Sequence, residues 1–145
     1  LLETAKRLNI PAEVITFNSK PTTQKKSGQV LSGNNEDILA GAIGWHRDGG
    51  THTPSAIKMS KLRYSSKPYR FMCIITDGHD NEGSITKELD GIPGIIPFQL
   101  AVGDGRLYLS EPYGIAVEDV KTLPGVLGGA ILKAVQGEIK PWRDR

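Results

Sequence analysis

The fold is decided by one stretch of the chain, YRFMCIITDGHDN, which covers residues 69–81. Residues 69–76 form a nearly continuous apolar run, which is typical of a strand buried on both faces of a parallel sheet. Asp77 follows this run directly, and Gly78, His79 and Asp80 come next. Because ligands bind at the carboxyl ends of strands in open α/β sheets, the sequence predicts a site at this junction.

Strands and helices alternate on either side of this stretch. The sequence predicts strands over residues 12–17, 69–76, 95–102 and 113–117, and helices over residues 1–8, 36–45, 54–64, 84–89 and 125–139. Thr53 is expected to cap the third helix, with Pro54 at its first position. Residues 18–34 are polar and predict a long loop, with a short edge strand near residues 29–31. The alternation predicts an α/β fold, namely an open, doubly wound, mostly parallel sheet with helices on both faces.

Length and composition limit the classes of protein. A chain of 145 residues fits a single domain, which we expect to span residues 1–145. The net charge of +2 is too small to predict nucleic-acid binding, and the basic residues between positions 58 and 70 are expected to form a solvated face. The single cysteine, Cys73, is expected to be a buried, inert thiol. One cysteine cannot form a disulfide framework within the chain, which indicates a reducing, cytoplasmic setting. No apolar run approaches the ~20 residues of a membrane span.

A second polar junction is GGTHT, residues 49–53, in which Thr51 follows a Gly-Gly turn. The Thr51 hydroxyl and the Asp77 carboxylate are hard oxygen groups, which suit magnesium, calcium or manganese. If the two loops lie side by side, both residues can bind one divalent cation. Each residue also has an ordinary structural explanation, because Thr51 can serve as a turn or cap hydroxyl and Asp77 can form an Asx-turn. On the residues alone both explanations stay open.

Several catalytic chemistries lack their motifs. The three histidines fit no zinc-ligand spacing and have no thiolate partner. The sequence contains neither a nucleophile elbow nor a Walker loop, and residues 103–105 match no dinucleotide fingerprint. A metal hydrolase built on Asp77, Asp80 and Glu82 would need a general base, for which His79 is the one candidate. The sequence therefore favours a protein that is not an enzyme.

In their order along the chain, three motifs resemble those of the von Willebrand factor A domain, whose fold is also called the integrin I domain. The motifs are GGTHT at residues 49–53, IITDG at residues 74–78 and LAVG at residues 100–103. The resemblance implies a Rossmann-like sheet and a metal-ion-dependent adhesion site (MIDAS) formed by three loops. The second loop of that family supplies a threonine, matched by Thr51, and the third supplies an aspartate, matched by Asp77. The implied cation is Mg²⁺, or Ca²⁺ or Mn²⁺.

The family's first metal loop, D-x-S-x-S, has no counterpart within residues 1–145. The helix predicted over residues 1–8 matches the end of the family's first helix. We therefore expect the first strand and its loop to lie upstream of Leu1, which would make this domain incomplete at its N-terminus. The cation site would be complete only with that loop.

The resemblance also implies a function. A cation with an open coordination position would bind an aspartate or glutamate of a protein partner, across a rim formed by Gly50, His52, Gly78, His79 and Asp80. Among relatives the chain looks most like bacterial, archaeal or phage forms, including the A domain of the cobaltochelatase subunit that works with an AAA+ ATPase. The alternatives are thus a subunit of an AAA+-driven chelatase or remodelling complex, and a structural assembly domain with a vestigial site, associated with a virion if it comes from a phage. No nucleic-acid partner is expected.

Overall fold

The computed structural model describes residues 7, 9–17, 21–26, 52–76, 84–103 and 105–144 of the chain. Two compact units are present. One comprises Leu1–Lys61 with Asp80–Gly83, and the other comprises Leu62–His79 with Ser84–Arg145. Within the described residues, no helix has the length and apolar character needed to cross a bilayer. The predicted helices over residues 1–8 and 36–45 lie outside the described residues, apart from Arg7.

The first unit contains a two-stranded antiparallel sheet, formed by β1 (Val14–Phe17) and β2 (Pro21–Lys25). The strand predicted over residues 12–17 is confirmed, although it begins two residues later. The loop predicted for residues 18–34 is wrong at β2, a strand that begins with a proline and continues with Thr22 and Thr23. β-branched residues favour extended backbone, and proline is tolerated as the first residue of a strand.

The first unit also contains α3 (Thr53–Met59), and the 3₁₀ turn that follows it, η1 (Lys61–Tyr64), begins in the first unit and continues into the second. The predicted helix is therefore interrupted at Ser60, whose ψ of 136° is extended. Glu13 holds this break in place, since its Oε1 accepts hydrogen bonds from Ser60 Oγ at 2.7 Å and from the Lys61 backbone N–H at 2.9 Å. The predicted cap is wrong by one residue, because His52 is the N-cap and Thr53 lies within the helix.

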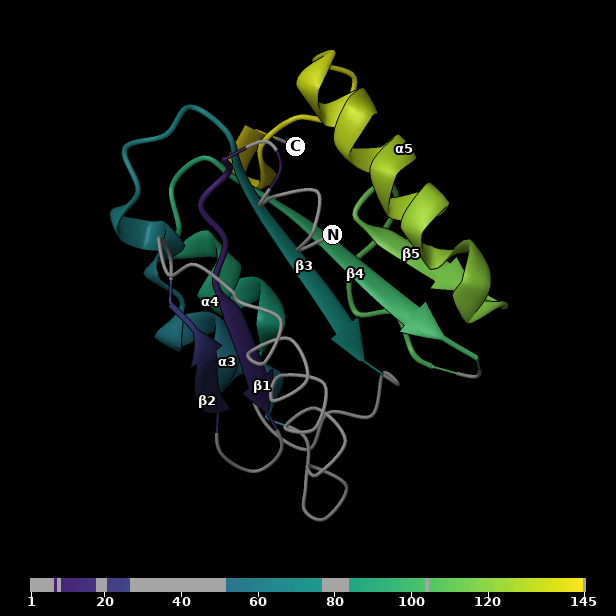
Figure 1. Ribbon diagram of the computed structural model, residues 1–145, viewed down its shortest axis with the longest axis horizontal. Helices are drawn as coiled ribbons and strands as arrows, with labels where there is room; N and C mark the ends of the chain where they lie inside the picture. The colour runs from purple at the N-terminus through teal and green to yellow at the C-terminus, as the bar shows by residue number, and fades with distance from the viewer. Residues whose placement is uncertain are drawn as a thin grey trace. The chain divides into compact units, whose positions relative to one another are not determined.

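The second unit contains a parallel sheet of three strands in the order β3 (Arg70–Thr76), β4 (Ile95–Val102) and β5 (Gly114–Val117) (Figure 1). Thr76 pairs with Ala101, and Val102 pairs with Val117. The prediction that the two long apolar runs form adjacent parallel strands is confirmed. Because the strands are parallel, their carboxyl ends lie at one edge of the sheet.

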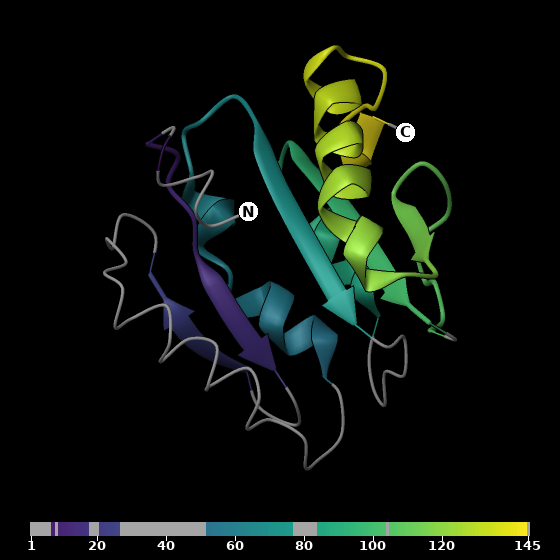
Figure 2. The same cartoon turned by 45° about the vertical axis from the view of Figure 1, so that its right-hand side comes forward.

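Helices cover both faces of this sheet. The α4 helix (Ile85–Asp90) connects β3 with β4, and α5 (Leu123–Val135) follows β5 and the 3₁₀ turn η2 (Val120–Thr122). Figures 1 and 2 show α4 and α5 on opposite faces, which confirms the predicted doubly wound architecture. The core contains the fully buried side chains of Leu89, Phe98 and Leu127. The α5 helix ends at Val135, earlier than predicted, and Gly137 beyond it has a φ of +80° that favours glycine.

β3 differs from β4 in the burial of its two faces. Met72 and Ile74 are buried, but Cys73 and Ile75 are exposed, Ile75 by 48%. The prediction of a strand buried on both faces is therefore wrong for one face of β3. In the register Cys73 pairs with Phe98, so this face is buried on β4 and uncovered on β3. The reason is position, because β3 is the outer strand of the sheet within the described part of the chain.

Cys73 combines an accessible surface with an apolar environment. The expectation of a buried residue is wrong, since Cys73 is exposed. Desolvation by the protein around the sulfur nevertheless raises the pKa of the thiol to about 12. The exposed surface belongs to the residue as a whole, whereas desolvation acts on the sulfur atom. An exposed residue and a raised thiol pKa are therefore compatible. A raised pKa leaves little thiolate at neutral pH, which agrees with the expectation of an inert thiol.

Two buried polar groups fix the connections of the second unit. Gln99 is fully buried on β4; its side chain donates to the Arg106 carbonyl at 3.0 Å and accepts from the backbone N–H groups of Tyr108 and Leu109. The final turn, η3 (Trp142–Asp144), is tied to α4 because Trp142 Nε1 donates to Asp90 Oδ1 at 2.8 Å. These bonds hold the β4–β5 connection against β4 and the C-terminal turn against α4.

Candidate functional site

The predicted site lies where β3 ends. The strand ends at Thr76, so Asp77 is the first residue beyond it. The other two strands end at Val102 and Val117, at the same edge of the sheet. Asp77, Gly78, His79 and Asp80 themselves lie outside the described residues. The structure thus confirms the strand that leads to Asp77, and the role of Asp77 as a ligand stays a prediction.

The second loop of the predicted site leads into α3. Gly50 and Thr51 lie outside the described residues, and His52 is the one rim residue within them. His52 is half-buried, and its Nδ1 shares a hydrogen bond with Ser55 Oγ in the first turn of α3. This contact was not predicted from the sequence, although three residues is a spacing at which side chains on one helix face meet. That Thr51 and Asp77 bind one cation stays a prediction.

An acidic residue follows every strand of the parallel sheet. Asp77 comes directly after β3, Asp104 is the second residue after β4, and Glu118 and Asp119 come directly after β5. Of these acids, only Asp77 was predicted as a site residue from the sequence. The signal that reveals the others is the position of each strand end, and the ends predicted at residues 76, 102 and 117 match those of β3, β4 and β5. Because parallel strands end at one edge of the sheet, the sequence positions of these acids predict a negatively charged edge.

Some of these acids have structural roles. Asp119 caps η2, because its Oδ1 accepts a hydrogen bond from the Lys121 backbone N–H at 2.9 Å. Gly103 ends β4 with a φ of +68°, and its backbone N–H donates to the Val117 carbonyl at 3.1 Å. In the part of the chain that the structure describes, no three histidine, cysteine, aspartate or glutamate side chains lie close enough together to hold a metal.

No family model and no curated protein matches the sequence. The fold is similar to that of proximal thread matrix protein 1 from the mussel byssus, with 19% identity and a TM-score of 0.64 over 88% of this chain. A structure of the same mussel protein with a zinc-occupied MIDAS motif is similar too, with 19% identity and a TM-score of 0.61 over 83% of this chain.

A bacterial structure is also similar in fold. The conserved hypothetical protein BatB from Bacteroides thetaiotaomicron has 20% identity and a TM-score of 0.59, covering 93% of this chain and 88% of its own. By contrast, this chain spans only 37% of the length of the mussel protein. These likenesses establish the fold, which is the open α/β fold that the resemblance to the von Willebrand factor A domain implied. The resemblance to the cobaltochelatase subunit stays a prediction.

Proposed function

We propose that this chain is a metal-ion-dependent protein-binding module that is not an enzyme. A divalent cation, held by Asp77 and Thr51 at the carboxyl edge of the sheet, accepts a carboxylate from a protein partner. The observation that carries the proposal is the position of Asp77, which directly follows β3 at an edge where acids also follow β4 and β5. A mussel protein of the same fold, which has a zinc-occupied MIDAS motif, supports it.

The donor set fits a hard cation. A carboxylate and a hydroxyl supply oxygen ligands, and Mg²⁺, Ca²⁺ and Mn²⁺ prefer oxygen. The cation supplies a positive charge with an open coordination position, which attracts the carboxylate of the partner. Gly50 and Gly78 leave room for the partner's backbone beside the site, because glycine has no side chain. His52, His79 and Asp80 complete the rim and supply polar contacts to the partner.

Residues 1–145 supply few ligands to this site. With one carboxylate and one hydroxyl from the protein, a cation keeps most of its waters, so we expect a dissociation constant on the order of 1 mM, the weak end for oxygen sites. A partner carboxylate adds a second negative ligand. Partner and metal should therefore strengthen each other's binding, since linkage between two ligands is reciprocal.

Paramagnetic broadening by Mn²⁺ tests the proposal, because it detects weak sites residue by residue. In the ¹⁵N-labelled chain, we expect Mn²⁺ to broaden the amide signals of residues 50–52 and 77–80 first. Asp77→Asn should abolish this broadening and Thr51→Ala should reduce it. Asp144→Asn, which alters an exposed carboxylate in η3, is the matched control and should leave it unchanged.

Acetate serves as the probe for the partner's carboxylate. We expect 50–100 mM acetate, roughly the range in which millimolar carboxylate binding saturates, to lower the Mn²⁺ concentration needed for half-maximal broadening. Asp77→Asn should remove this effect of acetate. Broadening that persists in Asp77→Asn, or that centres on residues 118–119 instead, would show that Asp77 does not hold the cation and would overturn the proposal.

A further inference from the structure

We propose that a second surface of this chain, at the amino end of β3, binds an acidic segment of a protein partner without any metal. The surface consists of Arg63, Tyr64, Lys67, Tyr69 and Arg70, and we call it the basic surface. All five residues belong to the second unit and lie between η1 and the start of β3. The proposal goes beyond the metal site, which lies at the other end of the same strand.

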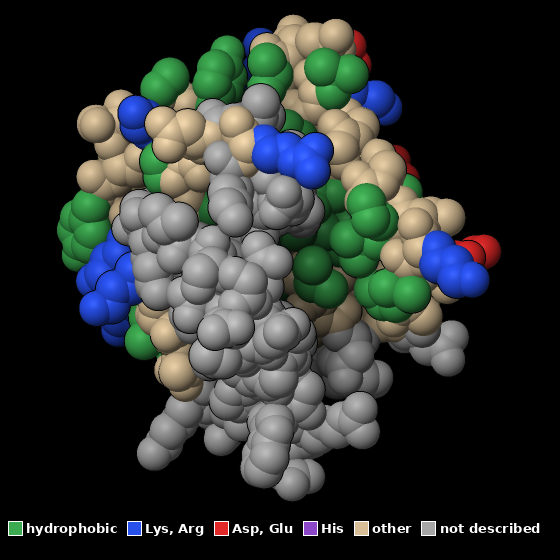
Figure 3. Space-filling view, in the orientation of Figure 1, with side chains coloured by type: hydrophobic (Ala, Val, Ile, Leu, Met, Phe, Trp, Pro, Cys, Tyr) green, Lys and Arg blue, Asp and Glu red, His purple; other side chains and the backbone are tan. Residues whose placement is uncertain are grey.

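The charge of the basic surface is of one sign. Residues 58–76 contain Lys58, Lys61 and the three cations of the basic surface, with no aspartate or glutamate among them. Figure 3 shows Lys and Arg side chains, without Asp or Glu beside them, where η1 leads towards β3. Interspersed charges would cancel, whereas a cluster of one sign attracts a segment of the opposite sign.

The two arginines have N–H groups for which no described residue provides a hydrogen-bond acceptor. Both Nε and Nη2 of Arg63 are covered by neighbouring atoms and have no hydrogen-bond partner among the described residues, and the same holds for Nε of Arg70. Arg70 is anchored through its Nη1, which donates to the Pro93 carbonyl. A cationic donor that is shielded from water and lacks an acceptor destabilises the protein, so a ligand that supplies the acceptor gains this energy on binding.

The unpaired atoms of Arg63 favour a carboxylate as that acceptor. Nε and Nη2 form one edge of the guanidinium plane, and two parallel N–H groups on one edge match the two oxygens of a carboxylate. Arg63 and Arg70 are half-buried as whole residues, so rotation of the side chain brings this edge to a partner without unfolding the backbone.

Two tyrosines give the basic surface an apolar component. Tyr64 is 76% exposed and Tyr69 is 51% exposed. The Tyr69 ring stacks on Phe71 with 6.2 Å between centroids, and Phe71 stacks on the fully buried Phe98 with 6.4 Å between centroids. Tyr69 is therefore both exposed and held in place from the core. Rigid tyrosine beside arginine is the composition that dominates the centres of protein interfaces.

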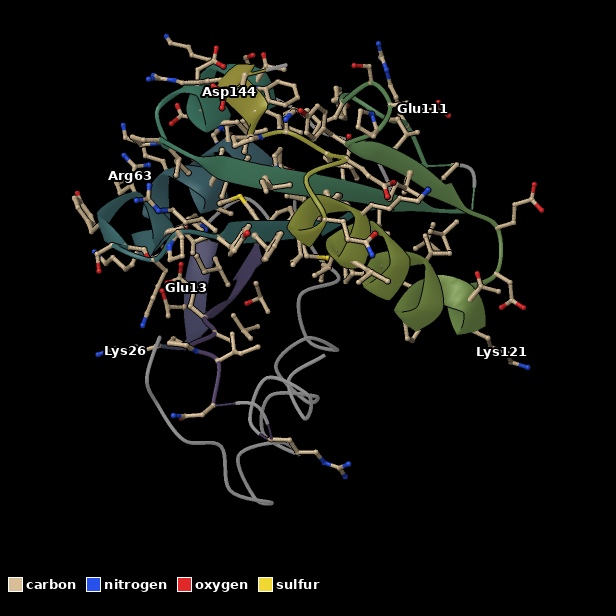
Figure 4. The ribbon with its side chains drawn as sticks, turned by 90° about the horizontal axis from the view of Figure 1, so that it is seen from above. Glu13, Lys26, Arg63, Glu111, Lys121 and Asp144 are labelled. Carbon is tan, nitrogen blue, oxygen red and sulfur yellow. The ribbon has the colours of Figure 1, made fainter. Side chains whose placement is uncertain are left out.

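A short acidic polypeptide fits this surface better than a nucleic acid does. The whole chain has a net charge of only +2, and nucleic-acid affinity depends on many phosphate contacts. A long polyanion would also reach the acids that follow the strands at the other edge. Arg70 and Thr76 begin and end β3, and six residue steps of ~3.3 Å place these edges ~20 Å apart. Figure 4 shows Arg63 and Lys121 at opposite ends of the sheet.

Fluorescein-labelled poly-L-glutamate of about six residues, too short to extend beyond the ~20 Å between the two edges, is the probe. Its binding to the 145-residue chain is measured by fluorescence anisotropy at low salt with EDTA present. EDTA removes any contribution of the metal site. We expect Arg63→Gln/Lys67→Gln to weaken binding at least tenfold. The matched control is Lys121→Gln/Lys133→Gln, which removes two exposed cations elsewhere in the second unit and should change the affinity by less than twofold. The tested pair leaves the Arg70 anchor intact, and thermal melts check that both variants fold.

Aromatic contact is tested separately. Tyr69→Ala should weaken poly-L-glutamate binding several-fold, whereas Tyr69→Phe, which keeps the stacked ring, should retain most of it. Equal losses in the tested and control pairs would mean that only net charge matters, and would overturn the proposal. Tighter binding of an oligo-dT of matched charge would overturn it in favour of a nucleic acid. Binding that requires metal and disappears with Asp77→Asn would assign the acidic segment to the metal site and leave only the proposed function.

Discussion

The thiol of Cys73 gives a quantitative test of the uncovered face of β3. Cys73 is exposed, so access alone predicts rapid modification, whereas a thiol pKa of about 12 predicts slow modification because the thiolate is the reacting form. At pH 8 a pKa of about 12 leaves a thiolate fraction of ~10⁻⁴, against ~0.2 for an ordinary thiol with a pKa of ~8.5. The thiolate population therefore falls by roughly 2,000-fold.

Part of this loss is recovered, because a more basic thiolate is a better nucleophile. With a Brønsted coefficient of ~0.4–0.5, a rise of ~3.5 in pKa increases intrinsic reactivity by roughly 25- to 60-fold. We therefore expect the folded chain to react with a disulfide reagent such as DTNB roughly 30- to 100-fold more slowly than the unfolded chain at pH 8. Cys73 is the single cysteine, so the release of thionitrobenzoate reports on this one residue.

The pH dependence separates deprotonation from access. If deprotonation in the folded state limits the rate, the rate should rise about tenfold per pH unit from pH 8 to pH 11, with circular dichroism to confirm that the chain stays folded. If the reagent instead waits for an opening of the structure, the rate should level off near pH 9, where an ordinary thiol is ionised. A folded-state rate equal to the rate in urea, or a plateau near pH 9, would refute the desolvated thiol.

The same pKa predicts a direction for stability. The folded-state pKa is raised, so the neutral thiol is favoured by folding. The contribution of the neutral thiol to the free energy of unfolding is fully present below the ordinary thiol pKa of 9.0. It is lost as the pH rises towards the folded-state pKa of about 12. Cys73→Ala should therefore flatten the decline in stability of the chain between pH 9 and pH 11. The exposure of the residue keeps the effect small.

Two further predictions concern the second unit, and urea unfolding measures both. Gly114→Ala should destabilise the chain by about 3 kcal/mol, because the new Cβ would lie 1.9 Å from the Leu109 carbonyl oxygen, a backbone atom in the connection that Gln99 holds. Gly128→Ala on α5 is the control. Nothing lies within 4 Å of the added Cβ there, so the helix should gain ~0.5–1 kcal/mol of stability. Equal effects of the two substitutions would contradict the crowding at Gly114. Trp142→Phe should cost ~1–2 kcal/mol by removing the bond to the Asp90 carboxylate, and an unchanged midpoint would show that this bond adds nothing.

Much of the parallel sheet could be predicted from the sequence. Long apolar runs bounded by glycine and acidic residues locate β3 and β4, and their order in an alternating pattern predicts that they pair in parallel. β2 could not be predicted in this way, because its threonines, glutamine and lysine are as polar as a loop and become a strand by pairing with β1. The exposed face of β3 has a similar cause. An apolar run has the same composition at the edge of a sheet as at its centre, and only its neighbours decide whether both faces are covered.

The sequence predicted where the candidate site lies better than it predicted which residues and contacts surround it. That Asp77 follows a strand could be read from the sequence, since local composition sets where a strand ends. The bond between His52 and Ser55 joins residues that are three apart in the sequence, so it could have been predicted. The acids that follow β4 and β5 were not predicted as part of the site, although the predicted parallel sheet already implied one carboxyl edge for all three strands. The contacts of Gln99 could not be predicted in this way, since they join a strand to a connection seven to ten residues away.

The direction of β3 explains how a short, nearly neutral domain can present two opposite chemistries. Parallel strands have one carboxyl edge, so the acids that follow each strand in the sequence are expected at that edge. The cations between η1 and β3 precede the strand and therefore lie at its other end. Over ~20 Å the two sets are separated by more than twice the ~8 Å Debye length at physiological ionic strength, so neither neutralises the other. A cation at one end and an acidic segment at the other can then bind with little mutual interference, which is why EDTA and substitution of Arg63 should act on separate binding events.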